Sequence, residues 1–244
     1  MMFDIHCHVL YGLDDGADSL DDSVKMISLA YEGGTRAIIA TPHCNVPNSY
    51  RNYHSQLFND RLAEISDRLA RQKIDVALYP GQEVFCSGRL ISMLREGKII
   101  TLNSSRYILV EFDFNENSAS AYVKLEQLVS EGLVPVVAHP ERYAFVCEEP
   151  DAAMRMKDIG CLLQVNKGSI KGAFGRPAFS AARHILNERL ADFVASDGHS
   201  PYVRTPYLAD AFEIVCDACS MDYAELLFEE NPRAVINNEE IYPF

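Results

Sequence analysis

Seven short apolar segments, each separated from the next by a longer stretch with helical spacing, constrain the fold of this 244-residue chain most strongly. Strands that read as continuous apolar runs and alternate with helices are typical of a parallel sheet covered by helices. Right-handed crossovers then allow an open doubly wound sheet or a closed barrel. The segments are MFDIHCHV, RAIIATPH, VALYPGQEV, YILVEFD, VPVVAHPE, LLQVN and DFVASDGH.

The stretches between these segments have helical periodicity and, in places, helix end signals. Ser19 precedes an amphipathic run that stops at Gly33 and Gly34, as expected for an N-cap and a glycine stop. No Ser/Gly linker or low-complexity stretch divides the chain, so we expect residues 1–244 to form a single domain. Helices are expected around residues 19–33, 50–72, 88–96, 118–131, 150–159, 176–189 and 205–229.

Polar, potentially metal-binding side chains end nearly every apolar run on its carboxyl side. In a parallel barrel the carboxyl ends of the strands meet around one mouth, where such folds build their active sites. An open sheet would spread the same residues along a line. We therefore expect an α/β fold with a barrel of seven strands. The residues are His6, His8, His43, Glu83, Glu111, His139, Asp197 and His199.

The spacing of these residues favours metal binding. His6 and His8 are two apart on a strand, so both imidazoles point to the same face and can reach one ion. Asp197 and His199 repeat that spacing around a glycine. With an acid from the Asp14-Asp15 pair, the candidate ligands exceed what one ion can take. Nitrogen and oxygen ligands without thiolate fit Mn, Fe or Zn.

So large a ligand set indicates two or three ions, with a carboxylate such as Glu83 bridging neighbours. Clusters of ions about 3.5–4 Å apart are typical of phosphoester hydrolysis, where they clamp the phosphoryl group and turn bound water into hydroxide. Arg142 and Arg204 follow the fifth and seventh segments on loops at the same mouth. A guanidinium matches phosphate in two-point contact, although a surface salt bridge is the alternative role for either arginine. His54 and His184 lie within helical patterns and are left out.

The charge balance and the chain start narrow the class of protein. The net charge of -13 disfavours a nonspecific nucleic-acid binder, which needs clustered cations. The residues Met1 to His6 lack the basic start of a signal peptide, and no apolar run approaches the length of a spanning helix. We expect a cytoplasmic protein without membrane insertion.

The seven cysteines show no repeated spacing and are expected to be reduced thiols. Cys216 and Cys219 form a CxxC inside a helical pattern, which we interpret as two small helix residues. Cys44 raises the alternative of a cysteine phosphatase, in which five residues separate the nucleophile from a phosphate-binding arginine. Tyr50 stands at the required place and Arg51 comes one residue late, so Cys44 is interpreted as a bystander.

The chain contains the motifs DIHCH and ATPH, a glutamate after the third strand, an acid after the fourth, and the motifs AHPER and ASDGH. In these features it resembles the PHP (polymerase and histidinol phosphatase) superfamily over essentially the whole chain. The resemblance implies a distorted seven-stranded (β/α) barrel with a trinuclear metal centre. It implies one ion held by His6, His8, Glu83 and Asp197, a second by Glu83, Glu111 and His139, and a third by Asp15, His43 and His199.

Within that superfamily, the chain is most similar to bacterial manganese-dependent protein tyrosine phosphatases of capsule and exopolysaccharide systems. Segments such as LDDGADS, LNSSRYILVEF, GLVPVVAHPERY and FEENPRAVI carry this similarity. It implies hydrolysis of phosphotyrosine on a protein, such as the tail of a bacterial tyrosine kinase, by a metal-bound hydroxide. Phosphate would bind to Arg142 and Arg204, and His43 or His199 would assist proton transfer. Histidinol phosphatase, with a small substrate, and a retired barrel used for binding are the alternatives.

Overall fold

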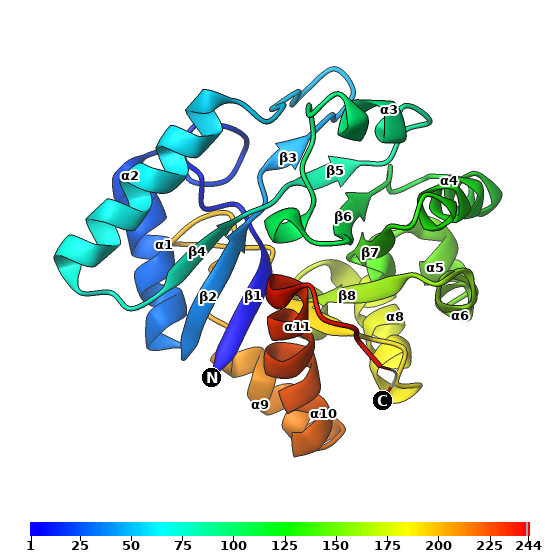
Figure 1. Cartoon of the computed structure of the whole chain (residues 1–244). Helices are drawn as coiled ribbons and strands as arrows, with labels where there is room; N and C mark the ends of the chain where they lie inside the picture. Colours follow the sequence, from blue (N-terminus) through cyan, green and yellow to red (C-terminus); the bar gives the residue numbers. More distant parts are fainter. Residues whose placement is uncertain (243) are drawn as a thin grey trace.

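The strands are short and pair in parallel throughout. The computed structural model describes residues 1–242 and 244, and in these residues nine strands form two sheets (Figure 1). The smaller sheet has the order β1-β2-β4 and the larger one β3-β5-β6-β7-β8-β9. The strands are β1 (Met2–Cys7), β2 (Thr35–Ala40), β3 (His43–Cys44), β4 (Ala77–Pro80), β5 (Glu83–Phe85), β6 (Tyr107–Glu111), β7 (Val134–Ala138), β8 (Leu162–Asn166) and β9 (Phe193–Ala195).

Two of the expected strands are each broken in the middle. The second becomes β2 and β3 around Pro42, and the third becomes β4 and β5 around Gly81. A proline lacks the N–H that a ladder needs. At Gly81 a Cβ atom would lie 2.6 Å from Ile39 Cγ2, so the backbone packs too closely there for a side chain. The predicted α/β class with parallel strands is confirmed, but the strands belong to two sheets rather than to one continuous ladder of seven.

Backbone contacts join the end of β1, in the smaller sheet, to the residues that follow β9, in the larger sheet. The N–H of His8 donates to Gly198 O at 2.9 Å, and the N–H of Asp197 donates to His6 O at 2.9 Å. Cys7 and Gly198 form an isolated parallel bridge. The residues that follow β9 therefore lie directly beside His6 in β1 and His8 just after it.

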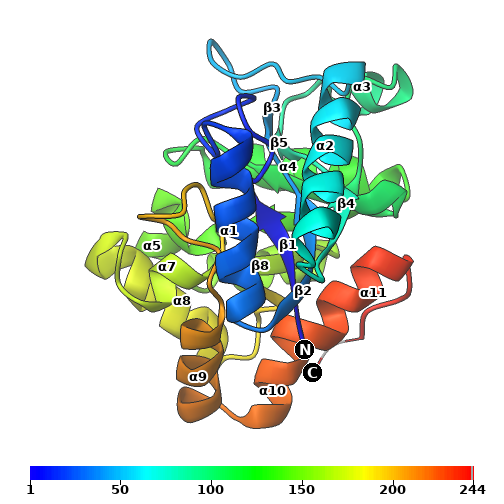
Figure 2. The same ribbon diagram turned by 90° about the vertical axis from the view of Figure 1, so that its left-hand side faces the viewer.

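Helices cover the outer faces of both sheets. Figure 2 shows α1 and α2 beside β1, β2 and β4, and Figure 1 shows α4, α6 and α8 around the larger sheet. Ser19 caps α1 as predicted, because its Oγ accepts the N–H of Asp22. The helices are α1 (Leu20–Glu32), α2 (Gln56–Gln72), α3 (Leu90–Arg95), α4 (Ser118–Ser130), α5 (Ala144–Glu148), α6 (Ala152–Ile159), α7 (Lys167–Ile170), α8 (Gly175–Asn187), α9 (Ala209–Ala218), α10 (Met221–Glu225) and α11 (Asn231–Asn237).

Two of the expected helices differ from the structure, and the short helices α5, α7 and α11 were not expected. Residues 50–55 are not helical, because Asn52 among them and Asn45 and Asn48 before them have positive φ, which favours a loop, and Ser55 caps α2 only from Gln56 on. The last expected helix is instead α9, α10 and a π-helical turn, Leu226–Glu230, after which α11 begins with Pro232 in its first turn.

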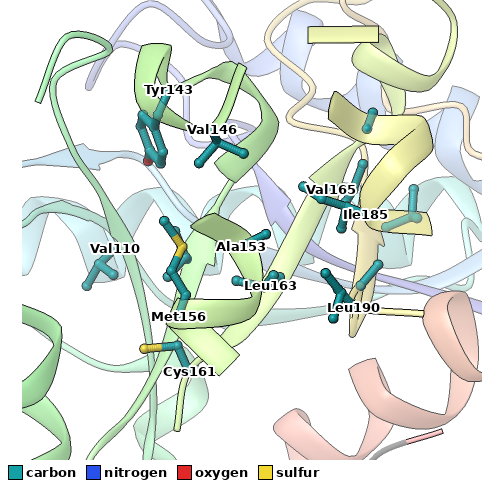
Figure 3. Close-up of a cluster of buried hydrophobic side chains, with 14 of the residues drawn as sticks. Val110, Tyr143, Val146, Ala153, Met156, Cys161, Leu163, Val165, Ile185 and Leu190 are labelled. Carbon is teal, nitrogen blue, oxygen red and sulfur yellow. The ribbon is translucent and has the colours of Figure 1, made fainter. Parts of the chain in front are cut away.

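Buried apolar side chains hold the helices on the sheets. Figure 3 shows one such cluster, in which Val110 and Leu163 of the larger sheet lie near Met156 and Ile185 of α6 and α8. A separate cluster joins side chains from β1, β2, β6, β7 and β9 with Val235 of α11. In the described part of the chain, no helix is both long and apolar enough to cross a membrane.

Candidate metal centre

The two histidines of the first strand face each other across a very short gap. His6 and His8 are fully buried, and their Nε2 atoms lie 3.1 Å apart. His6 Nδ1 donates to Gln164 Oε1 at 2.7 Å, and His8 Nδ1 donates to Asp14 Oδ2 at 2.8 Å. Burial lowers the pKa of both rings, but Glu83 outweighs it at His6 and Asp14 at His8, so both pKa values lie above the usual range. In the neutral form that binds a metal, these acceptors take the proton on Nδ1, and the Nε2 lone pairs of the two rings point at one another. Two lone pairs this close are stabilised by a cation between them, so this donor set fits a metal ion.

Glu83 lies at the centre of the histidines. Its Oε2 is 3.2 Å from His6 Nε2, 3.3 Å from His8 Nε2 and 3.0 Å from His43 Nδ1. Its Oε1 accepts from His139 Nε2 at 2.9 Å. Within the described residues the buried Oε2 has no well-aligned hydrogen bond, which is the arrangement of an atom that meets a metal. Burial would raise the pKa of Glu83, but His6 and His43 outweigh it and hold that pKa well below its usual range.

A second group of ligands lies on the outer side of His8. Asp15 Oδ1, on a half-exposed side chain, is 3.5 Å from His43 Nε2 and 3.6 Å from His199 Nε2. On the opposite side, His43 Nδ1 is 3.0 Å from Glu111 Oε1. Three sets of atoms are therefore close enough to hold an ion each: His8, Asp15, His43 and His199; His6, His8 and Glu83; and His43, Glu83 and Glu111.

Asp197 separates the histidines from two arginines. Its Oδ1 lies 3.6 Å from His6 Nε2 and 3.5 Å from His8 Nε2. Its Oδ2 accepts from Arg142 Nη1 at 3.4 Å and also from Arg204 Nη2. A cavity of about 250 Å³ opens here, lined by residues that include His43, Glu111, His139, Arg142 and Arg204.

Two of the candidate ligands have an unusual backbone. His139 has φ 35° and Asp197 has φ 49°, both in the left-handed region although neither is a glycine. Such conformations cost about 1–3 kcal/mol and cluster at functional sites. The nearby Gly16 is required by packing, since a Cβ atom there would lie 2.2 Å from His8 O.

The surroundings set the charge state of the outer histidines. Burial, His8 and Arg204 lower the pKa of His199 to about 2, and burial lowers that of His139. Both rings are therefore neutral at pH 7 and have a free lone pair. His43 differs: burial opposes its charge, but Glu83 and Glu111 outweigh it and raise its pKa to about 10. A cation bound beside Glu83 and Glu111 would balance their negative charge in place of the protonated His43 ring.

Four further residues support the ligands, and two of them, Gln164 and Asn166, were not identified from the sequence. Asp14 supports the site rather than binding an ion, because its buried carboxylate accepts from His8 Nδ1 and also accepts the N–H of His43 at 2.7 Å. Gln164 orients His6, and Asn166 donates to Asp197 at 2.5 Å. The segment LLQVN contained the signal, because two polar residues two apart on an apolar strand share one face. Asp4 accepts the N–H of His6 and of Ser196 at 3.2 Å each and so ties β1 to the end of β9.

Cys44 has no features of a nucleophile. It is fully buried, its Sγ donates to Arg51 O at 3.3 Å, and burial raises its pKa to about 12. A cysteine phosphatase needs a thiolate, so this alternative is disfavoured. All seven cysteines are free. His184 lies in α8 as expected, whereas His54 lies just before α2, and both are away from the centre.

Comparison with known proteins identifies the family. Residues 2–237 match the family model described as capsular polysaccharide synthesis, CpsB/CapC. The chain belongs to this family. It is 32% identical over 241 residues to the tyrosine-protein phosphatase YwqE of Bacillus subtilis, covering 99% of this chain and 94% of YwqE. The family resemblance inferred from the sequence motifs is thereby confirmed.

Solved structures agree at the level of the whole CpsB/CapC chain. One solved structure comes from a study of YwqE from B. subtilis and CpsB from Streptococcus pneumoniae, which are described as metal-dependent tyrosine phosphatases. It matches this chain with a TM-score of 0.92 and 30% identity, over 100% of this chain and 97% of the other. A histidinol phosphate phosphatase from Lactococcus lactis, at 15% identity and a TM-score of 0.58 over 89% of this chain and 94% of that one, shares the fold.

Proposed function

We propose that this chain is a metal-dependent protein tyrosine phosphatase that hydrolyses phosphotyrosine in a capsule or exopolysaccharide system. Family membership and the names of the relatives support the activity. We further propose that it acts in the cytoplasm as one domain over residues 1–244. Its substrate would be the phosphorylated tail of a bacterial tyrosine kinase.

The observation that carries the proposal is the convergence of His6 Nε2, His8 Nε2 and Glu83 Oε2 beside two arginines. The first three atoms suit a divalent cation, and the arginines suit a phosphoryl group. A purely structural ion-pair network has no need for two ring nitrogens 3.1 Å apart beside a buried carboxylate. A metal-binding site without phosphate chemistry has no need for both arginines.

We assign three ions, manganese in the cell, to the candidate ligands. His6, His8, Glu83 and Asp197 would hold the first. Glu83, Glu111 and His139 would hold the second, and Asp15, His43 and His199 the third. The contacts of His43 with both Glu83 and Glu111 also suit a place beside the second ion. Bound divalent ions would supply Lewis-acid charge and lower the pKa of water at this mouth.

The protein's own groups would bind and orient the substrate. Arg142 and Arg204 would transfer their hydrogen bonds from Asp197 to the phosphoryl oxygens, with the charge-assisted geometry that guanidinium provides. The leaving group is a phenolate whose conjugate acid has a pKa near 10, so its departure needs little acid catalysis. Proton transfer is assigned to His43 or His199, whose rings lie on either side of Asp15.

We also propose that the two sheets close into a distorted barrel of seven strands, with β2–β3 and β4–β5 each counted as one. The Cys7–Gly198 bridge supports closure between β1 and the end of β9. The cluster of apolar side chains contributed by β1, β2, β6, β7 and β9 supports an enclosed interior.

Turnover of a phosphotyrosine peptide and of histidinol phosphate by Mn-loaded protein tests the function. We expect higher kcat/KM on the peptide and no turnover after complete chelation, with recovery when Mn²⁺ is restored. Activity that survives complete metal removal would refute the metal-dependent mechanism. Higher efficiency on histidinol phosphate would overturn the substrate assignment.

A further inference from the structure

The two arginines of the site share one aromatic neighbour. Phe174, in the turn between α7 and α8, has its ring centroid 4.2 Å from the guanidinium carbon of Arg142 and 5.6 Å from that of Arg204. The ring centroid of Phe114, after β6, is 4.5 Å from the same guanidinium carbon of Arg142. The Arg142 guanidinium therefore packs against two phenyl rings.

Hydrogen bonds alone do not fix these arginines. Within the described residues, each guanidinium donates to a single acceptor, Asp197 Oδ2, and the partly buried Arg204 leaves its Nε unpaired. Two adjacent guanidinium groups repel each other, and their long side chains have many rotamers. The negative face of an aromatic ring attracts a cation and restricts its plane without occupying the N–H groups.

The chain makes specific room for this ring. A Cβ atom on Gly168 in α7 would lie 2.5 Å from Phe174 Cε2, so the ring packs directly on the glycine. Phe174 is only half-buried and belongs to none of the three main apolar clusters. Its contacts with Arg142 and Arg204 are thus more prominent than any role in the core.

We infer that Phe174 is a positioning residue, which holds the guanidinium groups of Arg142 and Arg204 toward a phosphoryl group, with Phe114 as a second restraint on Arg142. This inference rests on the proposed function, because it takes both arginines as phosphate ligands. Phe174 acts through the arginines, whose guanidinium groups it faces. The hydrogen-bond donors thereby stay free for substrate while the planes of the two groups stay fixed.

The test measures binding of inorganic phosphate to Mn-loaded protein by calorimetry, together with KM and kcat on a phosphotyrosine peptide. In Phe174→Leu, which removes the ring face, we expect the Kd for phosphate to rise about 3- to 30-fold, the range that a desolvated cation–π contact gives. KM should rise by a similar factor and kcat should change less. Phe174→Tyr, which keeps the ring, should stay within about twofold of the wild type.

The matched control is Phe179→Leu, since Phe179 lies on the adjoining helix α8 and likewise faces an arginine, Arg183 at 5.7 Å, away from the site. It should bind phosphate like the wild type. If Phe174→Leu does not fold, Gly168→Ala replaces it, because the added methyl displaces the ring and should weaken phosphate binding in the same direction. Metal content and melting temperature are measured for every variant, so that loss of ions is not mistaken for loss of positioning.

The outcomes separate this inference from the proposed function. Phosphate affinity unchanged in Phe174→Leu, or equally weakened in Phe179→Leu, overturns the positioning role even if the peptide is hydrolysed normally. Failure of the wild type to hydrolyse phosphotyrosine overturns the function. If phosphate binding still depends on Phe174 in that case, the positioning role stands for another phosphoester.

Discussion

The metal-facing and phosphate-facing halves of the site are held by different means. On the metal side, His6 and His8 are fully buried, and each ring is fixed by a buried hydrogen bond. On the phosphate side, the side chains of Arg142 and Arg204 are 18% and 32% exposed and share one carboxylate oxygen. The metal half is thus preorganised by the strands, whereas the phosphate half is built to exchange partners when substrate arrives.

The largest effect is expected from removing the charge at the centre of the metal half. In Glu83→Gln the side chain keeps its size but loses the carboxylate that lies between His6, His8 and His43. Metal-ion charge is worth several kcal/mol in the transition state, so kcat/KM should fall by about a thousandfold or more. Bound Mn²⁺, measured by elemental analysis, should fall in parallel.

Glu126→Gln is the matched control for that substitution. Glu126 is a half-exposed residue that meets Arg155 at 3.9 Å on the surface, and its change should leave both metal content and activity as they are. A Glu83→Gln protein that keeps full metal content and turnover would contradict the central role of this carboxylate.

The same contrast explains what the sequence could predict. Strand pairing alone brings the polar residues at the carboxyl ends of the apolar segments to one mouth. These residues include His6, His8, Glu83 and His139. Asp14 lies in a loop, where the direction of a side chain depends on local turns. Here the N–H of Gly16 donates to Asp14 Oδ1 and fixes the carboxylate. Sequence spacing does not report this geometry.

Contacts between distant segments are equally hidden in the sequence. Phe174 meets Arg142 and Arg204 only because α7, the turn after β7 and the loop before α9 come together in the fold. Proline and glycine, as at Pro42 and Gly81, are residue types that interrupt strands. A sequence pattern does not show that the strand continues in another sheet after the interruption. Residue type was therefore more predictable than tertiary neighbourhood.

An effect of intermediate size is expected on the phosphate half. Arg142→Lys and Arg204→Lys keep the charge but lose the forked donors that bind two oxygens at once. Charge-assisted hydrogen bonds contribute about 1.5–3 kcal/mol, so KM for a phosphotyrosine peptide should rise about 10- to 100-fold with little loss of metal. Arg233→Lys, at an exposed pair with Glu229, is the control and should behave as the wild type. Loss of bound Mn²⁺ in the arginine variants would show that the two halves are not separable.

Asp14→Asn tests whether the metal half depends on its supporting residues. The substitution keeps the shape but weakens the acceptor for His8 Nδ1, and such supporting changes typically lower metal affinity about 10- to 100-fold. Activity should therefore fall at low Mn²⁺ and recover when Mn²⁺ is raised, as measured in a metal titration. Asp18→Asn, on an exposed residue of the same loop, should leave the titration unchanged. Equal titrations for Asp14→Asn and the wild type would remove Asp14 from the support of the site.

The smallest effect on activity is expected from substituting Cys44. This substitution tests whether the reaction uses a thiol nucleophile instead of the metal-facing half of the site. Its thiol is buried with a pKa raised to about 12, so less than a thousandth of it is ionised at pH 7. Cys44→Ala should keep kcat/KM within about twofold, because no step needs the sulfur, and should cost about 1 kcal/mol of stability for the lost buried atom. Steady-state kinetics and urea unfolding measure the two quantities separately. If activity vanished while the metals and the fold remained, the nucleophile would have to be the thiol, and the metal-facing half would lose its catalytic assignment.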